Sequence, residues 1–218
     1  MTLITIKPGA VLHHLGYMPL LISVFLLCGC AQTIFLAPSY EPLAGIKPLF
    51  PPDRQPSIQL VITGYDEHDW FATDRYTFLL RDTPSVILHD ALTKELSAMG
   101  MHMATDGRQN TARLEAAIRW FAPLGEDYRW TGIILSFALY EKGQSEPVWR
   151  GKTEGAAGTK RPYFLIAINP APLEDAMVRA VQKALRELNW NAGFNRAVKR
   201  LADQGTRHCC DDGLFPQE

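Results

Sequence analysis

The sequence of 218 residues lacks most of the patterns on which enzymes and nucleic-acid-binding proteins depend. It holds only four cysteines and six histidines, and they do not recur at the spacing of a metal site or of a Cys–His catalytic pair. It has no nucleophile elbow and no phosphate loop of the G-x-x-x-x-G-K-[ST] type. The formal net charge is only −1, so no broad attraction to nucleic acid or to an anionic membrane is expected. We therefore expect no enzyme activity, cofactor, metal or nucleic-acid partner, and no small-molecule ligand.

The apolar run at residues 20–27 follows an opening whose only charged residue is Lys7. As a helix this run would span about 12 Å, less than half of a bilayer core, so it is too short to cross a membrane. A short apolar run that ends in small residues is typical of a secretory signal peptide.

Four residues close this run, Leu27-Cys28-Gly29-Cys30, and they resemble the lipobox of bacterial lipoproteins. The resemblance implies cleavage between Gly29 and Cys30 and attachment of acyl chains such as palmitate to the Cys30 thiol. An ordinary signal peptide followed by a chance cysteine is the alternative. Ala31 resembles the residue found after the cysteine in lipoproteins sorted to the outer membrane, since the inner-membrane retention signal is typically Asp.

Six prolines lie within residues 31–56. Each fixes φ and removes a hydrogen-bond donor, which favours an extended tether; a wholly polyproline-like segment would reach ~80 Å at ~3.1 Å per residue. Thr33-Ile34-Phe35-Leu36 interrupts it with the composition of a short edge strand, so the tether is expected to be partly ordered. We expect a lipoprotein signal peptide at 1–29, a lipidated N-terminus with a Pro-rich tether at 30–56, a periplasmic domain at 57–203 and a disordered tail at 204–218.

The tail contains adjacent cysteines in His208-Cys209-Cys210-Asp211-Asp212. Neighbouring side chains diverge on an extended backbone, so vicinal thiols rarely bridge each other or chelate one ion alone. An intermolecular disulfide and a metal-binding tail are the functional alternatives to an incidental C-terminus.

Periodicity predicts the elements of the domain. Thr83 and Pro84 open a helix with a hydroxyl cap, and Gly100 follows its end. The predicted strands lie at 57–65, 112–121, 130–140 and 147–154, and the predicted helices at 84–99, 173–188 and 194–201; residues 75–80 could add a second short strand. The order strand, helix, three strands, two helices predicts an α+β two-layer sandwich, with a mainly antiparallel sheet and helices on one face.

Two faces are predicted in detail. In the strand at 112–121, Leu114, Ala116, Ile118 and Trp120 share one side. The helix at 173–188 carries an apolar stripe whose flanks mix both charge signs, which favours packing on the sheet over lying in a membrane interface. The stripe consists of Leu173, Ala176, Met177, Ala180, Val181, Ala184, Leu185 and Leu188.

Three other stretches invite functional interpretations. Asp66-Glu67-His68-Asp69 and Asp74 could serve a hydrolase or a metal, but consecutive carboxylates usually mark a solvated loop. Gly155-Ala156-Ala157-Gly158-Thr159-Lys160 lacks the spacing of a phosphate loop, and its small residues are expected to let the strand end. Loop aromatics could form an apolar patch for a partner or an acyl chain, or serve as lids on the core; these are Trp70, Phe71, Tyr163 and Phe164.

The lipobox, the tether that starts Thr33-Ile34-Phe35-Leu36-Ala37-Pro38 and the element order together resemble the YajG-like family of bacterial lipoproteins. A helix ending in Leu96-Ser97-Ala98-Met99-Gly100 and the stripe at 176–188 extend this resemblance. It implies a lipid-anchored envelope protein facing the periplasm from the outer membrane, with no established chemistry. A non-enzymatic binding or structural module is therefore expected, whose partners are membrane lipid through acylated Cys30 and an envelope protein. The auxiliary lipoprotein of ABC-type lipid transport systems has a similar layout, which makes an accessory subunit of such a system the alternative.

Overall fold

The computed structural model describes residues 32–64, 69–72, 76–104, 112–124, 130–160, 166 and 168–211. Its strands are β1 (Gln32–Leu36), β2 (Ser57–Gly64), β3 (Asp69–Ala72), β4 (Tyr76–Leu80), β5 (His102–Met103), β6 (Ala112–Leu124), β7 (Trp130–Glu141) and β8 (Pro147–Gly158). Its helices are α3 (Pro84–Ala98), α5 (Ala171–Asn189), α6 (Ala192–Asp211) and the 3-10 turn η1 (Pro52–Arg54). Among the residues described, no helix is both long and apolar enough to span a bilayer.

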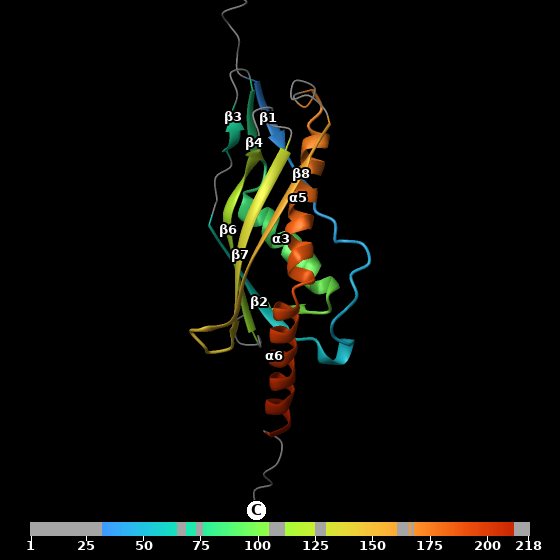
Figure 1. The fold of residues 1–218 in the computed structure, drawn as a ribbon, viewed down its shortest axis with the longest axis vertical. Coiled ribbons are helices and arrows are strands. Elements are labelled where there is room, and N and C mark those ends of the chain that lie inside the picture. The colour runs from blue at the N-terminus through green and yellow to red at the C-terminus, as the bar shows by residue number, and fades with distance from the viewer. Residues whose placement is uncertain are drawn as a thin grey trace, which may run out of the picture.

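The main sheet has five strands in the order β5-β2-β6-β7-β8, and α3 and α5 pack against it (Figure 1). The predicted α+β two-layer fold is thus confirmed. Strands β6, β7 and β8 form the expected antiparallel meander, whereas β2 pairs in parallel with β6 and with β5. The reason is that α3 carries the chain back between β2 and β6, and a crossover of this kind joins parallel neighbours.

A second, small sheet has the order β1-β4-β3. The predicted edge strand near Phe35 is therefore present as β1, in parallel with β4. Ile34 and Leu36 are buried on one side of β1, whereas Phe35 is 60% exposed on the other.

A β-bulge corrects the predicted face of β6. The pairing with β7 shifts between Ile118 and Trp120. A bulge of this kind adds one residue and reverses the side-chain alternation beyond it. As a result Phe121, rather than Trp120, is buried next to Leu114, Ala116 and Ile118.

Helix α5 lies on the sheet as its apolar stripe predicts, because all eight stripe residues are buried. Gly155 of β8 faces it so closely that an added Cβ would lie 1.9 Å from the backbone oxygen of Ala180 and 2.8 Å from the nitrogen of Ala184. The sequence predicts that the small residues at 155–158 end the strand. The structure instead continues β8 through them to Gly158. At Gly155 the missing side chain lets the helix backbone approach.

The polar side of α5 also covers the free edge of β8. Arg179 and Lys183 donate to the backbone oxygens of Gly158 and Ala156 at 3.0 and 2.7 Å, and the backbone nitrogen of Glu154 donates to Glu187 at 3.1 Å. The length of four residues along the helix is similar to that of two residues along the strand. Side chains four apart on α5 therefore reach backbone groups two apart on the edge of β8. An edge covered in this way is protected against pairing with another chain.

The helix ends differ in part from prediction. Gly100 has φ +82°, and the amides of Gly100 and Met101 donate to the carbonyls of Ser97 and Leu96, which is the Schellman motif. Thr83 precedes α3, but its hydroxyl makes no capping hydrogen bond. Helix α6 continues to Asp211 and so includes the first part of the tail expected to be disordered; residues 212–218 lie outside the described residues.

Candidate functional site

The segment between β1 and η1 is bound to the domain rather than free. We call residues 37–49 the strap. The amide of Ala37 donates to Glu174 at 2.7 Å, Gln182 donates to the carbonyl of Glu41 at 3.0 Å, and the amide of Leu49 donates to the carbonyl of Met99 at 2.8 Å. Tyr40 within it is only 3% exposed. The expectation of a free spacer is thus corrected: residues 37–49 lie along α5 and α3, because apolar side chains such as Tyr40 and Leu49 pack into or against the core.

Glu95 of α3 is the polar centre of this contact and is 1% exposed. Its Oε1 accepts hydrogen bonds from the Tyr40 hydroxyl and from the amide of Leu43, at 2.7 Å for the amide. Its Oε2 accepts from Asn189 of α5 at 2.9 Å. One carboxylate therefore joins the strap, α3 and α5, with a donor for each oxygen, as burial of such a group requires.

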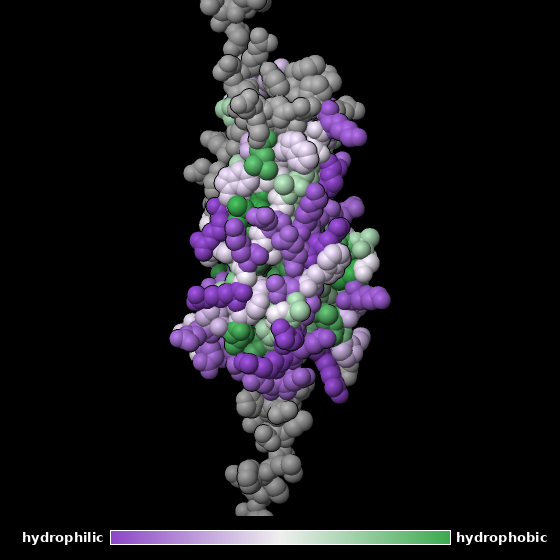
Figure 2. All heavy atoms as spheres, viewed as in Figure 1, coloured by the Kyte–Doolittle hydropathy of each residue, from purple (hydrophilic) through white to green (hydrophobic). Residues whose placement is uncertain are grey.

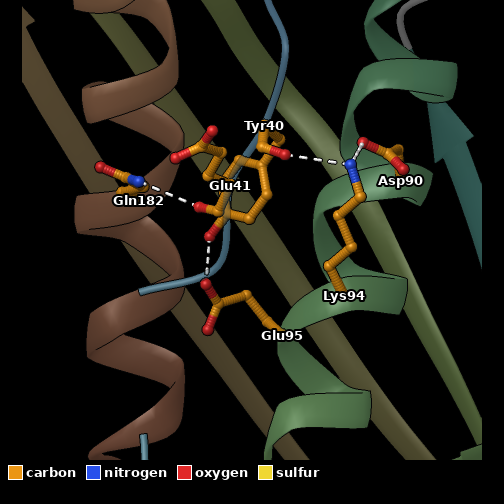
Figure 3. A network of polar contacts seen from close by, with 6 residues as sticks. All are labelled: Tyr40, Glu41, Asp90, Lys94, Glu95 and Gln182. Carbon is orange, nitrogen blue, oxygen red and sulfur yellow. Dashed lines mark hydrogen bonds and ion pairs between the residues drawn. The ribbon is translucent and has the colours of Figure 1, made fainter. Parts of the chain in front are cut away.

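The neighbours of Glu95 reinforce the junction (Figure 3). Lys94 donates to the backbone oxygen of Tyr40 at 3.0 Å and pairs with Asp90 at 2.7 Å. Burial of Tyr40, together with its hydrogen bond to the Glu95 carboxylate, raises the pKa of the phenol well above its ordinary value. The phenol thus remains a donor at physiological pH.

Sequence reasoning missed Glu95, although a signal was present. Leu88, Ala91, Leu92 and Leu96 define the apolar face of α3, and Glu95 lies one helical turn after Ala91 on the same face. A charged residue inside an apolar stripe indicates a buried, partnered carboxylate. Its partner Tyr40 is 55 positions away in the sequence, and no periodicity could identify it.

The candidate binding surface lies at the end of α5, around Trp190. Trp190 ends α5 and is 78% exposed, and the Arg186 guanidinium lies over its ring at 5.9 Å. Two hollows share these residues. The strap groove, about 520 Å³, is also lined by strap residues 43–47 and by Met99. The sheet groove, about 600 Å³, is also lined by Trp120 and by other residues of β6, β7 and β8.

The side chains around Trp190 form a surface suited to binding. An exposed indole beside a guanidinium, with hollows on either side, offers apolar area and a fixed positive charge to a partner. Among the described residues, no group of three or more His, Cys, Asp or Glu side chains is placed to hold a metal ion.

Most of the residues singled out in the sequence are not brought together by the described structure. Leu27, Cys28, Gly29 and Cys30 lie outside the described residues, as do Asp66, Glu67, His68, Asp74, Tyr163 and Phe164. Asp69, Trp70 and Phe71 belong to β3, and His208, Cys209 and Cys210 belong to α6. Only the backbone positions of these last six residues are described.

The fold defines the chain as an α+β two-layer domain, and comparison with solved structures agrees. The structure of protein XCC0632 from Xanthomonas campestris, of family DUF330, matches with a TM-score of 0.55 at 12% identity, over 78% of this chain and 99% of that one. This likeness shows a shared fold.

Other matches to solved structures are weaker. A putative lipoprotein from Caulobacter crescentus CB15 matches with a TM-score of 0.36 at 15% identity, over 53% of this chain and 83% of that one. A minor lipoprotein from Acinetobacter baumannii matches with a TM-score of 0.39 at 13% identity, over 64% and 92%. No family model matches the sequence, and no curated protein matches it.

Proposed function

We propose that the chain is a lipoprotein of the bacterial cell envelope that acts as a non-enzymatic binding module. Its anchor is the acylated thiol of Cys30, after cleavage at Gly29, and the domain faces the periplasm from the outer membrane. The support for the anchor is the pattern Leu27-Cys28-Gly29-Cys30 after a short apolar run. Ala31 favours the outer membrane.

The observation that carries the binding role is the exposure of Trp190 beside Arg186, between the strap groove and the sheet groove. Tryptophan and arginine dominate the energetics of protein interfaces when they enter pockets of a partner. Burial of an exposed indole gains free energy roughly in proportion to the apolar area removed from water. A folded envelope protein is therefore the expected partner.

Site-specific photo-crosslinking in living cells tests this role. A crosslinking amino acid at position 190 is expected to capture one discrete envelope protein. The same amino acid at Val86, which is 53% exposed on α3, serves as the matched control and is expected to capture none. Equal crosslinking from both positions, or none from position 190, would contradict the proposed surface.

The accessory subunit of a lipid transport system is the second candidate, and the sheet groove favours it. The groove is open and lined by Trp120, Leu124 and Ile134, which present apolar area to an acyl chain. Mass spectrometry of lipids extracted from the purified protein tests this alternative. A stoichiometric phospholipid, lost on Ile134→Arg but retained on Val86→Arg, is the expected result for a lipid carrier.

A further inference from the structure

Strand β1 begins very close in the chain to Cys30, the proposed site of the lipid anchor. Cys30 and Gln32 are two residues apart, so covalent geometry limits the distance between their Cα atoms to about 7 Å. Strand β1 begins at Gln32 and is paired with β4 over its whole length. The strap that follows is bound to α5 and α3. An acyl group on Cys30 would therefore hold the folded domain directly at the bilayer, without a flexible spacer.

The contacts of the strap show which end of the domain this is. The strap runs along α5 in the direction of that helix, from Ala37 at Glu174 to Glu41 at Gln182. Strand β1 precedes the strap and thus lies beyond the start of α5. Figure 1 shows the small sheet and the start of α5 at one end of the molecule and α6 at the other.

Exposed apolar side chains gather at the end that carries β1. Phe35 lies on the open side of β1 and is 60% exposed, and Ile168, just before α5, is 80% exposed. Trp130, where β7 begins opposite the last residue of β8, is 51% exposed. Figure 2 shows hydrophobic side chains at the surface near this end, and others elsewhere on the same face. Phe35 lies at most about 17 Å along the chain from Cys30, within reach of the lipid headgroups.

We propose that this end of the domain is a membrane-docking surface, in which Phe35 and Ile168 enter the headgroup region of the bilayer that holds the acylated Cys30. The inference rests on the proposed lipid anchor and adds a second, apolar contact to it. The lipid surface is the occupant because the short covalent connection brings it to this end before any soluble partner. Aromatic and aliphatic side chains enter the interface with a gain proportional to the apolar area they bury, and Trp130 suits its polar boundary.

A docking surface would fix the orientation of the domain on the membrane. Acyl chains alone leave a domain free to tilt. Contacts at Phe35 and Ile168 would fix its orientation, with Trp190 directed away from the membrane toward a periplasmic partner. Because the contact is apolar, it is expected to persist at high salt, unlike attachment through basic residues.

Depth-dependent quenching tests the proposal. The full chain is expressed with Cys209→Ser and Cys210→Ser, and one further cysteine carries an environment-sensitive dye: Phe35→Cys, Ile168→Cys, or the controls Val86→Cys and Trp190→Cys. The protein is reconstituted into phosphatidylethanolamine–phosphatidylglycerol vesicles containing brominated lipid, and the mass of the N-terminal peptide is measured on the same samples. The expected result is severalfold stronger quenching at positions 35 and 168 than at 86 and 190, unchanged in 1 M salt.

Each other outcome overturns the proposal in a recognisable way. An acylated Cys30 with equal quenching at all four positions refutes docking and leaves the lipid anchor intact. An unmodified Cys30 thiol, read from the mass, refutes the anchor and docking together.

Discussion

The buried carboxylate of Glu95 offers the sharpest test of how the strap is held. In Glu95→Leu the three donors that meet this carboxylate lose their acceptor; they belong to Tyr40, Leu43 and Asn189. A buried donor left unsatisfied costs about 1–3 kcal/mol, and two of these contacts are only partly buried, so water can replace part of the loss. We expect the free energy of unfolding to fall by about 3–5 kcal/mol, out of a total of about 5–15 kcal/mol for a domain.

The assay is urea unfolding with thermal melts of matched variants. Each 1 kcal/mol shifts the melting temperature of a domain of this size by about 2–4 °C, so Glu95→Leu is expected to melt about 6–20 °C lower. Glu95→Gln keeps one acceptor oxygen but places an amide N–H₂ against a donor, and is expected to cost about 1–2 kcal/mol. Limited proteolysis should cut the strap first in Glu95→Leu.

The competing expectation is also physical. Replacing a buried charge by a well-packed hydrophobic residue is often neutral or stabilising. Glu95→Leu within about 1 kcal/mol of the native protein, with the strap still resistant to protease, would show that apolar burial alone holds the strap and would refute the role given to the carboxylate.

Three further predictions concern the phenol, the helix contact and the covered edge. The pKa of Tyr40 is raised in the folded state, so its contribution to stability is complete below the unfolded value near 10 and declines as the pH rises above it. Above that pH the native protein should lose stability more steeply than Tyr40→Phe. Urea titrations in which both proteins lose stability equally with pH would contradict this. Gly155→Ala forces α5 away from β8 at the Ala180 carbonyl and should cost at least about 1–3 kcal/mol, so an unchanged urea midpoint would show that the helix can shift freely. Arg179→Ala with Lys183→Ala uncovers the edge of β8 and should raise light scattering on storage, whereas a scattering signal equal to that of native protein would mean the edge needs no cover.

How far the sequence predicts this molecule depends on whether a signal is local. The stripe of α5 was predicted residue by residue, because burial on one side of a helix imposes a period of 3.6. The alternation of Ile133, Leu135, Phe137 and Leu139 in β7 was equally accessible, since all four are buried. Gly100 predicts the end of α3, because glycine readily adopts the left-handed conformation that the structure shows there.

The features that were missed depend on contacts between distant residues. The bulge in β6 shifts the pairing with β7 and reverses the side-chain alternation beyond it, and it is defined by the partner strand rather than by the local sequence. The parallel pairing of β2 with β6 depends on how α3 packs, which composition does not encode. The strap looked like a spacer because proline density is a local property, whereas its attachment depends on Glu95 and on Tyr40 fitting between two helices.

The lipid anchor is tested most directly by mass spectrometry of the N-terminal peptide, taken from membrane and soluble fractions of cells that produce the native chain or Cys30→Ala. A peptide that begins at Cys30, carries acyl chains and is found with the membranes is the expected result, with Cys30→Ala retained as the uncleaved precursor. A native chain recovered from the soluble periplasm with a free thiol at Cys30 would contradict the anchor and every orientation inferred from it.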